Sequence, residues 1–264
     1  MVENTPSAAE KMETILSMYQ ESMECDFNKI LSLSGQMTVE CGLHPYTMEL
    51  LTLLCLTRHA KELYAERELS DELFYHTMLD LRYKLEECHL VKGICGTFVG
   101  WWFPRFFQLR IFAFGRLQFE KRRSGITYEK GDVKVTPDTQ ILGLHIPRTG
   151  TRLDQESCLE AFAMAKEFFK ADLGEHPIVL CNSWLLFPKH REFLPESSNI
   201  LKFMDLFDIY GWHYTLERTD LWRFFDTDEQ HPDRLPTDTS LRRAYVEYLK
   251  RGGRPGEGNG LRVL

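Results

Sequence analysis

A short segment in the second half of the chain combines residue types that can bind an anion and move a proton. His145 lies at the end of an apolar run, and Arg148-Thr149-Gly150-Thr151-Arg152 follows before a helical pattern. A strand that enters a helix through a glycine turn leaves backbone N–H groups free, and the helix dipole adds partial positive charge. The turn therefore predicts a site for an anionic ligand. The alternative is an ordinary turn with solvated arginines.

His145 is the residue of this segment that could act as a base. A neutral histidine can accept a proton from an amine near pH 7. The alternative is a histidine that is only hydrogen-bonded on its strand. Cys181 and Ser183, at the end of the next apolar run, could act as nucleophiles with His145 or His190 as base. No G-x-S-x-G motif surrounds them, so the pattern gives little support to a hydrolase.

The elements that must position these residues form a unit of strand, turn, helix and strand. The apolar runs over 141–146 and 178–181 predict two strands, and Asp154 and Gly174 are typical of the start and end of the helix between them. Around this unit we expect a long strand over 109–121 with a bend at Gly115, a short strand over 133–135, a helix over 200–207 capped by Ser197 or Ser198, strands over 209–216 and 221–225, a polar loop over 226–238 and a helix over 239–250. We expect the glycine-rich tail over 252–260 to be mobile unless it covers a ligand.

The first 90 residues are predicted to be helical. Apolar residues recur there at helical spacing, and His44-Pro45 and Ser70 are typical helix starts. The stripes predict core positions rather than a ligand pocket, and they include Met48, Leu51, Leu54 and Leu56. We expect a bundle of four or five helices as one domain over 1–92 and an α+β domain around a mixed sheet over 93–264.

Composition argues against several classes of protein. The net charge of -7 at pH 7 disfavours a protein that coats nucleic acid, because phosphate neutralisation needs clustered Lys and Arg. The 7 cysteines have no C-x-x-C spacing, and residues 1–11 lack the apolar core of a signal peptide. No apolar run is long enough for a membrane span. We therefore expect a cytoplasmic protein without a nucleic-acid or membrane partner.

Four blocks in the second half of the chain carry a family resemblance. They are His145-Ile146-Pro147 with the glycine turn, Cys181-Asn182-Ser183-Trp184-Leu185-Leu186-x-Pro188, Leu194-Pro195-x-x-Ser198-Asn199-Ile200, and Pro236-x-Asp238-Thr239-Ser240-Leu241-x-Arg243-Ala244. Together they resemble bacterial acyltransferases that have a helical N-terminal domain and a GNAT-like C-terminal domain. The resemblance covers the chain from about Arg110 to its end, and the helical half is similar in character.

The resemblance implies a GNAT-like mixed sheet with helices on both faces. It also implies a reaction in which an acyl group passes from acyl-CoA to a small amine by direct attack on the thioester, without a metal. The diphosphate of CoA would then lie on Arg148, Thr149, Gly150, Thr151 and Arg152. The resemblance gives His145 the role of base, Ser183 that of a hydroxyl that orients the thioester or exchanges a proton with the thiolate, and Tyr214 that of the acid. Tyr210 is the alternative acid.

A function from another class also fits the sequence. The chain could be a non-catalytic module that keeps the GNAT-like fold and binds acyl-CoA, another small ligand or a partner. A protein of this kind would bind the thioester without transferring its acyl group.

Overall fold

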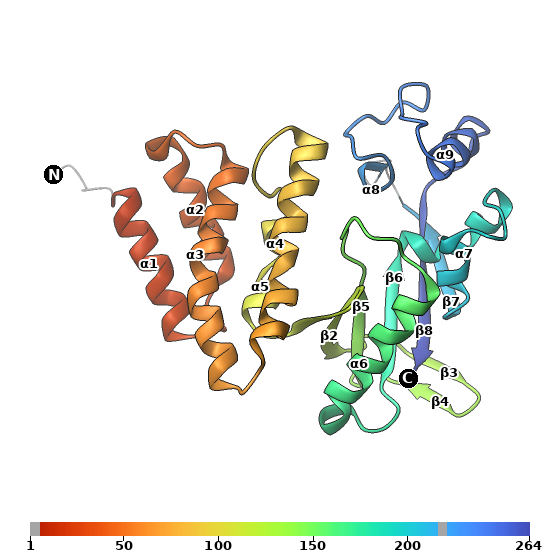
Figure 1. Ribbon diagram of the computed structural model, residues 1–264, viewed down its shortest axis with the longest axis horizontal. Coiled ribbons are helices and arrows are strands. Elements are labelled where there is room, and N and C mark those ends of the chain that lie inside the picture. The colour runs from red at the N-terminus through yellow and green to blue at the C-terminus, as the bar shows by residue number, and fades with distance from the viewer. Residues whose placement is uncertain (1–5, 216–220) are drawn as a thin grey trace. The chain divides into compact units, whose positions relative to one another are not determined.

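The computed structural model describes residues 6–215 and 221–264. The chain forms two compact units, which divide between Phe112 and Ala113. The first unit is built mainly from helices, and the second is built around a sheet (Figure 1). The fold class that the sequence predicts, a helical bundle followed by an α+β domain, is confirmed.

The first unit contains four long helices and two short ones in the described residues. They are α1 Ala8–Glu21, α2 Phe27–Cys41, α3 Pro45–Glu66, α4 Asp71–Lys92, η1 Gly100–Trp102 and α5 Pro104–Phe107. The starts of α3 and α4 lie where the sequence predicts them. Pro45 is tolerated in a first helical turn, and the Ser70 hydroxyl accepts a hydrogen bond from the Leu73 N–H.

The residues between α4 and the sheet pack into the helical unit. The Tyr19 hydroxyl donates to the Phe107 carbonyl at 2.7 Å, and Trp102 Nε1 donates to Asp80 Oδ2 at 3.2 Å. These long-range contacts tie the segment after α4 to α1 and α4. The division at Phe112 consequently lies later in the chain than the domain boundary predicted near residue 92.

The second unit is built around a six-stranded mixed sheet, whose first strand begins two residues before the division, with a two-stranded hairpin and several helices. The sheet order is β1-β2-β5-β6-β8-β7. Its strands are β1 Ile111–Phe114, β2 Leu117–Arg123, β5 Gln140–His145, β6 Ile178–Ser183, β7 Asp208–Tyr214 and β8 Gly256–Val263. The hairpin consists of β3 Tyr128–Lys130 and β4 Val133–Val135, and the helices are α6 Gln155–Leu173, η2 Trp184–Leu186, η3 Pro188–Glu192, α7 Asn199–Met204, α8 Trp222–Phe225 and α9 Ser240–Lys250.

Strand direction places three strand ends at the same edge of the sheet. β5 and β6 are parallel, while β8 is antiparallel to both β6 and β7. β5, β6 and β7 therefore run in the same direction, and their carboxyl ends meet at one edge. Because parallel neighbours need a crossover, α6 connects β5 to β6.

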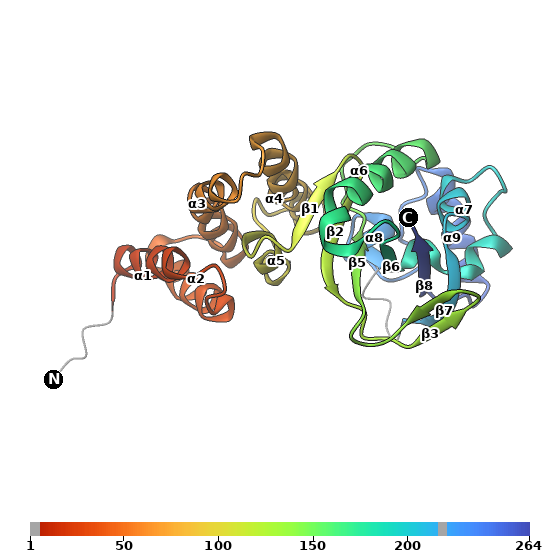
Figure 2. The same ribbon diagram turned by 90° about the horizontal axis from the view of Figure 1, so that it is seen from below.

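α6 and α7 pack on one face of the sheet, and the β3–β4 hairpin lies on the opposite face (Figure 2). On the helical face the ring of Phe162 from α6 contacts Phe119 of β2 at 5.9 Å and Phe207, after α7, at 6.0 Å between centroids. The buried cluster on the hairpin face consists of Val135, Ile141, Leu180 and Leu261. The hairpin thus covers the hydrophobic part of a face that is polar nearer the carboxyl ends of the strands.

The segment predicted as one long strand over 109–121 forms two strands. Gly115 has φ +54°, in the left-handed region that favours glycine, and with Arg116 it forms the turn between β1 and β2. β1 and β2 are neighbours in the sheet. The bend predicted at Gly115 is therefore a reversal of the chain.

The strand predicted over 221–225 is wrong, because this segment contains the short helix α8. Leu221, Phe224 and Phe225 belong to one buried cluster with Tyr245 of α9. Their spacing of three and four residues places them on one side of a helix, whereas a strand would alternate them. The predicted end of the preceding strand, Leu216, lies outside the described residues, and β7 ends at Tyr214.

The expectation of a mobile glycine-rich tail is also wrong, because this tail forms β8 between β6 and β7. A Cβ at Gly258 would lie 2.0 Å from the Leu186 carbonyl oxygen, and one at Gly256 would lie 2.4 Å from the Phe187 ring. Glycine therefore lets β8 approach the segment that follows β6. The absence of side chains, which indicates mobility in an isolated segment, here permits close packing.

Three further features concern the cysteines, the helices and the possible metal ligands. All 7 cysteines are free. None of the helices in residues 6–215 and 221–264 is both long and apolar enough to cross a membrane. Within the same residues, no group of His, Cys, Asp and Glu side chains is arranged to hold a metal ion.

Candidate active site

The parallel strands β5 and β6 stop pairing before either strand ends. Their ladder ends at the pair Gly143↔Leu180, whereas β5 continues to His145 and β6 continues to Ser183. Over these last residues, the described chain has no ladder that joins β5 to β6. The pairing of the two strands therefore ends before the strands do, at the carboxyl edge of the sheet. Ligands of open α/β sheets commonly bind outside the carboxyl ends of the strands.

His145 lies at this strand end and contacts a buried carboxylate. Its Nε2 lies 3.1 Å from Oε2 of Glu120, which belongs to the neighbouring strand β2. In the β2–β5 register, Glu120 pairs with Gly143 and Gln118 pairs with His145, so these polar side chains share one face of the sheet. The side chain of Glu120 is only 8% exposed. A carboxylate at one ring nitrogen fixes the orientation of a histidine and stabilises its protonated form.

Residues 147–152 connect β5 to α6, and both arginines of this loop bind other parts of the unit. Arg148 Nη2 donates to Asp226 Oδ2 at 2.7 Å. Arg152 Nη2 donates to Asn199 Oδ1, at the start of α7, at 3.0 Å. The residues predicted to bind an anion therefore lie in one loop. Both of its arginines already have hydrogen-bond partners within the protein.

The backbone of the same loop is held by short-range contacts. Gly150 has φ +76°, which favours glycine, and the hydroxyls of Thr149 and Thr151 lie 2.7 Å apart. Arg116, in the β1–β2 turn, donates from Nη1 to the Pro147 carbonyl at 2.7 Å. These contacts fix the turn that the sequence predicts before the helix.

The start of α6 is capped by its own side chain. Asp154 Oδ1 accepts a hydrogen bond from the Ser157 N–H at 2.9 Å, as the sequence predicts for an N-cap residue. This backbone hydrogen bond is the main reason why the pKa of Asp154 lies below its usual value. The cap uses one of the N–H groups that the helix start would otherwise offer to an anion.

Ser183 and Cys181 end β6 in different environments. The Ser183 hydroxyl accepts a hydrogen bond from the Leu185 N–H at 3.2 Å, which starts the turn η2. Cys181 is buried, and burial raises the pKa of its thiol. His190 is also buried, and burial lowers its pKa to about 4. A buried thiol with a raised pKa is a poor nucleophile, which weakens the hydrolase alternative.

The two tyrosines lie on β7, at the edge of the sheet. In the order β5-β6-β8-β7, Tyr214 is three strand spacings from β5, which is about 14 Å at roughly 4.8 Å per strand. The guanidinium of Arg254 lies 4.8 Å from the centre of the Tyr214 ring. Tyr210 packs against Tyr128 at 5.5 Å between centroids, and burial raises its pKa. The structure therefore does not bring either tyrosine next to His145.

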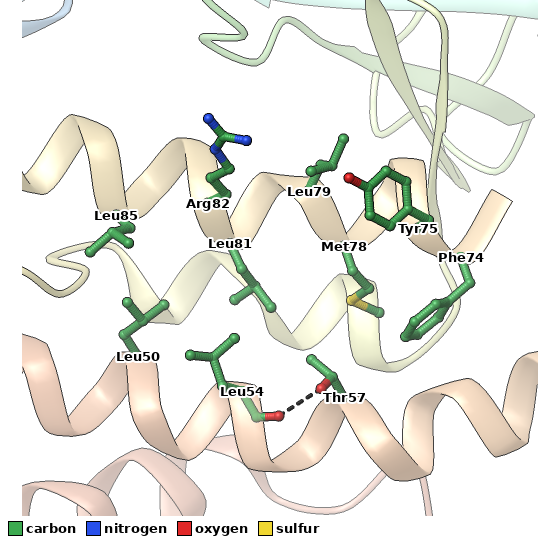
Figure 3. Close-up of a pocket in the computed structure, with 10 residues that line it drawn as sticks. All are labelled: Leu50, Leu54, Thr57, Phe74, Tyr75, Met78, Leu79, Leu81, Arg82 and Leu85. Atoms are coloured by element: carbon green, nitrogen blue, oxygen red, sulfur yellow. Dashed lines mark hydrogen bonds between the residues drawn. The ribbon is translucent and has the colours of Figure 1, made fainter. Parts of the chain in front are cut away.

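A separate pocket of about 300 Å³ lies between α3 and α4 in the helical unit (Figure 3). Its lining is mostly apolar and consists of Leu50, Leu54, Thr57, Phe74, Tyr75, Met78, Leu79, Leu81, Arg82 and Leu85. Leu54, predicted as a core residue, is 45% exposed. No residue that the sequence predicts for catalysis or cofactor binding lies in this pocket.

Sequence reasoning missed the residues that hold the predicted site in place. Glu120 lies within the run predicted as a strand over 109–121, and nothing in that run marks it as the partner of His145. Asp226 reaches Arg148 from 78 residues away, so no local pattern could indicate their contact. Arg116 lies inside the segment that was predicted as a continuous strand.

Comparison with known families assigns the chain. A profile described as a GNAT-like C-terminal domain matches residues 111–262, and one described as an N-acyltransferase N-terminal domain matches residues 4–109. The chain belongs to the N-acyltransferase family with a GNAT-like C-terminal domain. The resemblance that the sequence blocks indicate is thereby confirmed, and so is the assignment of the chain as an acyltransferase.

Solved structures share the fold of this N-acyltransferase. An acyltransferase in complex with decanoyl-CoA and teicoplanin is 24% identical, with a TM-score of 0.77 over 97% of this chain and 78% of that chain. An acyltransferase mutant in complex with octanoyl-CoA is 22% identical, with a TM-score of 0.75 over 97% and 77%. An acyltransferase in complex with CoA and 10C-Teicoplanin is 21% identical, with a TM-score of 0.72 over 97% and 76%. No curated protein matches the chain.

Proposed function

We propose that this chain transfers an acyl group from acyl-CoA to an amine. The observation that carries the proposal is the end of pairing between β5 and β6 beside a glycine turn that enters α6, in a chain of this family. Structures of the same fold were solved with decanoyl-CoA and octanoyl-CoA, which supports the choice of donor.

The donor would bind across the turn and the strand ends. Its diphosphate would lie against the backbone N–H groups of residues 148–153, close to Arg148 and Arg152. The thioester would enter between the ends of β5 and β6, where backbone N–H groups that lack a partner strand can hold the carbonyl oxygen. Fixed N–H groups of this kind stabilise the negative charge that develops on that oxygen during attack.

The proposed acid–base chemistry uses His145 with Glu120. A neutral His145 that donates from Nε2 to Glu120 carries its lone pair on Nδ1, the nitrogen that would take the proton of the amine. The amine nitrogen bonds to the thioester carbon, the carbon–sulfur bond breaks, and the thiolate leaves. The Ser183 hydroxyl can donate a hydrogen bond to this thiolate, and the proton that His145 took from the amine passes through water to the sulfur. Tyr214 would need a relay across the sheet to donate to the sulfur.

The acceptor is proposed as an amine, without a limit on its size. Two of the similar structures contain teicoplanin or 10C-Teicoplanin. A small amine, as expected from the sequence, and a larger molecule that carries an amine are therefore both candidates. A bacterial cytoplasm is the proposed setting, and the 7 free cysteines support a reducing compartment.

One observation favours the second candidate function, a binding module without turnover. Arg148, Arg152 and Asp154 are each already bonded to groups of the protein. A loop that is satisfied in this way could have lost its affinity for a diphosphate. Binding and turnover must therefore be measured separately.

The first prediction concerns donor binding through Arg148. Decanoyl-CoA should raise the melting temperature of the wild-type protein, because a ligand that binds only the folded state stabilises it by about 2.7 kcal/mol at 100 times its Kd. Arg148→Glu should abolish the increase, since it places a negative charge beside the diphosphate. Thermal unfolding monitored with and without decanoyl-CoA measures both effects.

Arg191→Glu is the matched control for this experiment. Arg191 forms a similar exposed ion pair, from Nη2 to Asp205 Oδ1 at 2.5 Å, outside the loop. This variant should keep the ligand-induced increase. Absence of any increase in the wild type would contradict donor binding, and an increase without release of free CoA in the presence of amines would support the binding module.

A further inference from the structure

Arg148, in the loop proposed to bind the donor diphosphate, already binds a carboxylate of the protein. Arg148 Nη2 and Arg242 Nη2 both donate to Oδ2 of Asp226, at 2.7 Å and 2.5 Å. Arg148 comes from the loop before α6, Arg242 from α9, and Asp226 from the residue that follows α8. One carboxylate oxygen therefore links the loop to the last helices of the unit.

The two arginines differ in how firmly they are held. Arg242 Nε donates to the Phe224 carbonyl at 3.0 Å, and its Nη1 donates to both carboxylate oxygens of Asp238 at 2.9 Å. Its side chain is 15% exposed, whereas that of Arg148 is 40% exposed. Arg242 is therefore a fixed structural partner of Asp226, and Arg148 is the partner that can be released.

The backbone fixes the position of the carboxylate. Asp226 has φ +55°, and its N–H donates to the Trp222 carbonyl at 2.9 Å at the end of α8. Asp and Asn tolerate this left-handed conformation better than most residues with a side chain. The carboxylate is therefore presented to Arg148 by the end of a helix.

We propose that Asp226 sets the affinity of the loop for the acyl donor, because its carboxylate holds the position on Arg148 that a donor phosphate would take. This inference rests on the proposed function. The charges of Arg148, Arg242, Asp226 and Asp238 sum to zero, so an incoming phosphate meets a neutral cluster. When the donor binds, its phosphate replaces the Asp226 carboxylate on Arg148. The loss of that contact makes the free energy of donor binding less favourable.

Removal of the carboxylate charge should therefore strengthen donor binding. In Asp226→Asn the same cluster carries one net positive charge, and the backbone keeps a residue that accepts a positive φ. We expect the Kd for CoA to fall about two- to fivefold, the size of a partly exposed charge contact. The Kd should also depend more steeply on ionic strength than in the wild type, because the added attraction is screened by salt.

Isothermal titration of the full chain with CoA at two ionic strengths tests the proposal. Asp205→Asn, which removes the carboxylate of the exposed pair with Arg191, should leave the Kd unchanged. If Asp226→Asn folds poorly, Asp226→Gly removes the carboxylate and also accepts a positive φ. An unchanged or higher Kd in these Asp226 variants overturns the proposal. Lack of CoA binding by the wild type and the variants overturns the proposed function as well.

Discussion

At the scale of single residues, the proposed chemistry depends on a contact between neighbouring strands. His145 ends β5, and Glu120 lies on β2, so the pair forms only when the two strands adopt their register. The buried carboxylate gives the ring one orientation and a partner for its proton. Because the pair depends on this register, the sequence alone indicates His145 as a candidate base but not Glu120 as its partner.

The histidine prediction is best tested by kinetics. His145→Gln should lower kcat about 10²- to 10⁴-fold, the usual contribution of a general base, with a small effect on the KM for acyl-CoA. Glu120→Gln should lower kcat less, because an amide can still orient the ring but does not stabilise its protonated form. Release of CoA, followed against pH, measures both effects.

His213→Gln is the control, because His213 is an exposed histidine on β7, which pairs with β8 at the edge of the sheet. This variant should retain the pH profile of the wild type. The role of His145 would be contradicted if His145→Gln kept the wild-type kcat and the same dependence on pH.

At the scale of elements, the glycines of β8 decide whether the sheet can close between β6 and β7. Gly258 faces Ser183 in the register and lies against the backbone of Leu186. The strand β6, which carries Ser183, can therefore pair with β8 at this point only because residue 258 is a glycine. Geometry at the proposed site consequently depends on positions that have no chemistry of their own.

Gly258→Ala should therefore destabilise the protein. A Cβ would lie 2.0 Å from a backbone oxygen, which cannot move aside like the end of a flexible side chain. We expect a loss of about 1–3 kcal/mol, typical of overpacking. Gly35→Ala, in the interior of α2 with nothing within 4 Å of the added Cβ, should instead stabilise by about 0.5–1 kcal/mol. Urea denaturation compares the two, and equal stability of Gly258→Ala and wild type would contradict the packing described for β8.

The predicted elements differ in how local their signals are. Asp154 and Gly174 bound α6 as predicted, because capping depends on groups within a few residues. β8 was missed since its partners lie in β6 and β7, far away in the sequence. The strand predicted over 221–225 failed for a related reason, because its aromatic residues suit either element until the cluster around Tyr245 selects a helix.

At the scale of the whole molecule, the fold and family could be predicted from the sequence, and the arrangement of the site only in part. The order of elements from helical bundle to mixed sheet follows from periodicity, and the four sequence blocks indicate the family. The turn over 148–152 could be proposed as an anion site because its residues are consecutive. Its contact with Asp226 depends on how α8 and α9 pack, which no local pattern reports.

The most direct measurement of the central claim is a crystal structure of the full chain with bound decanoyl-CoA. We expect the diphosphate within hydrogen-bond distance of the backbone N–H groups of residues 148–153 and the thioester between the ends of β5 and β6. We also expect Arg148 to contact a phosphate. A diphosphate bound elsewhere, with Arg148 still on Asp226 and the strand ends empty, would contradict the claim.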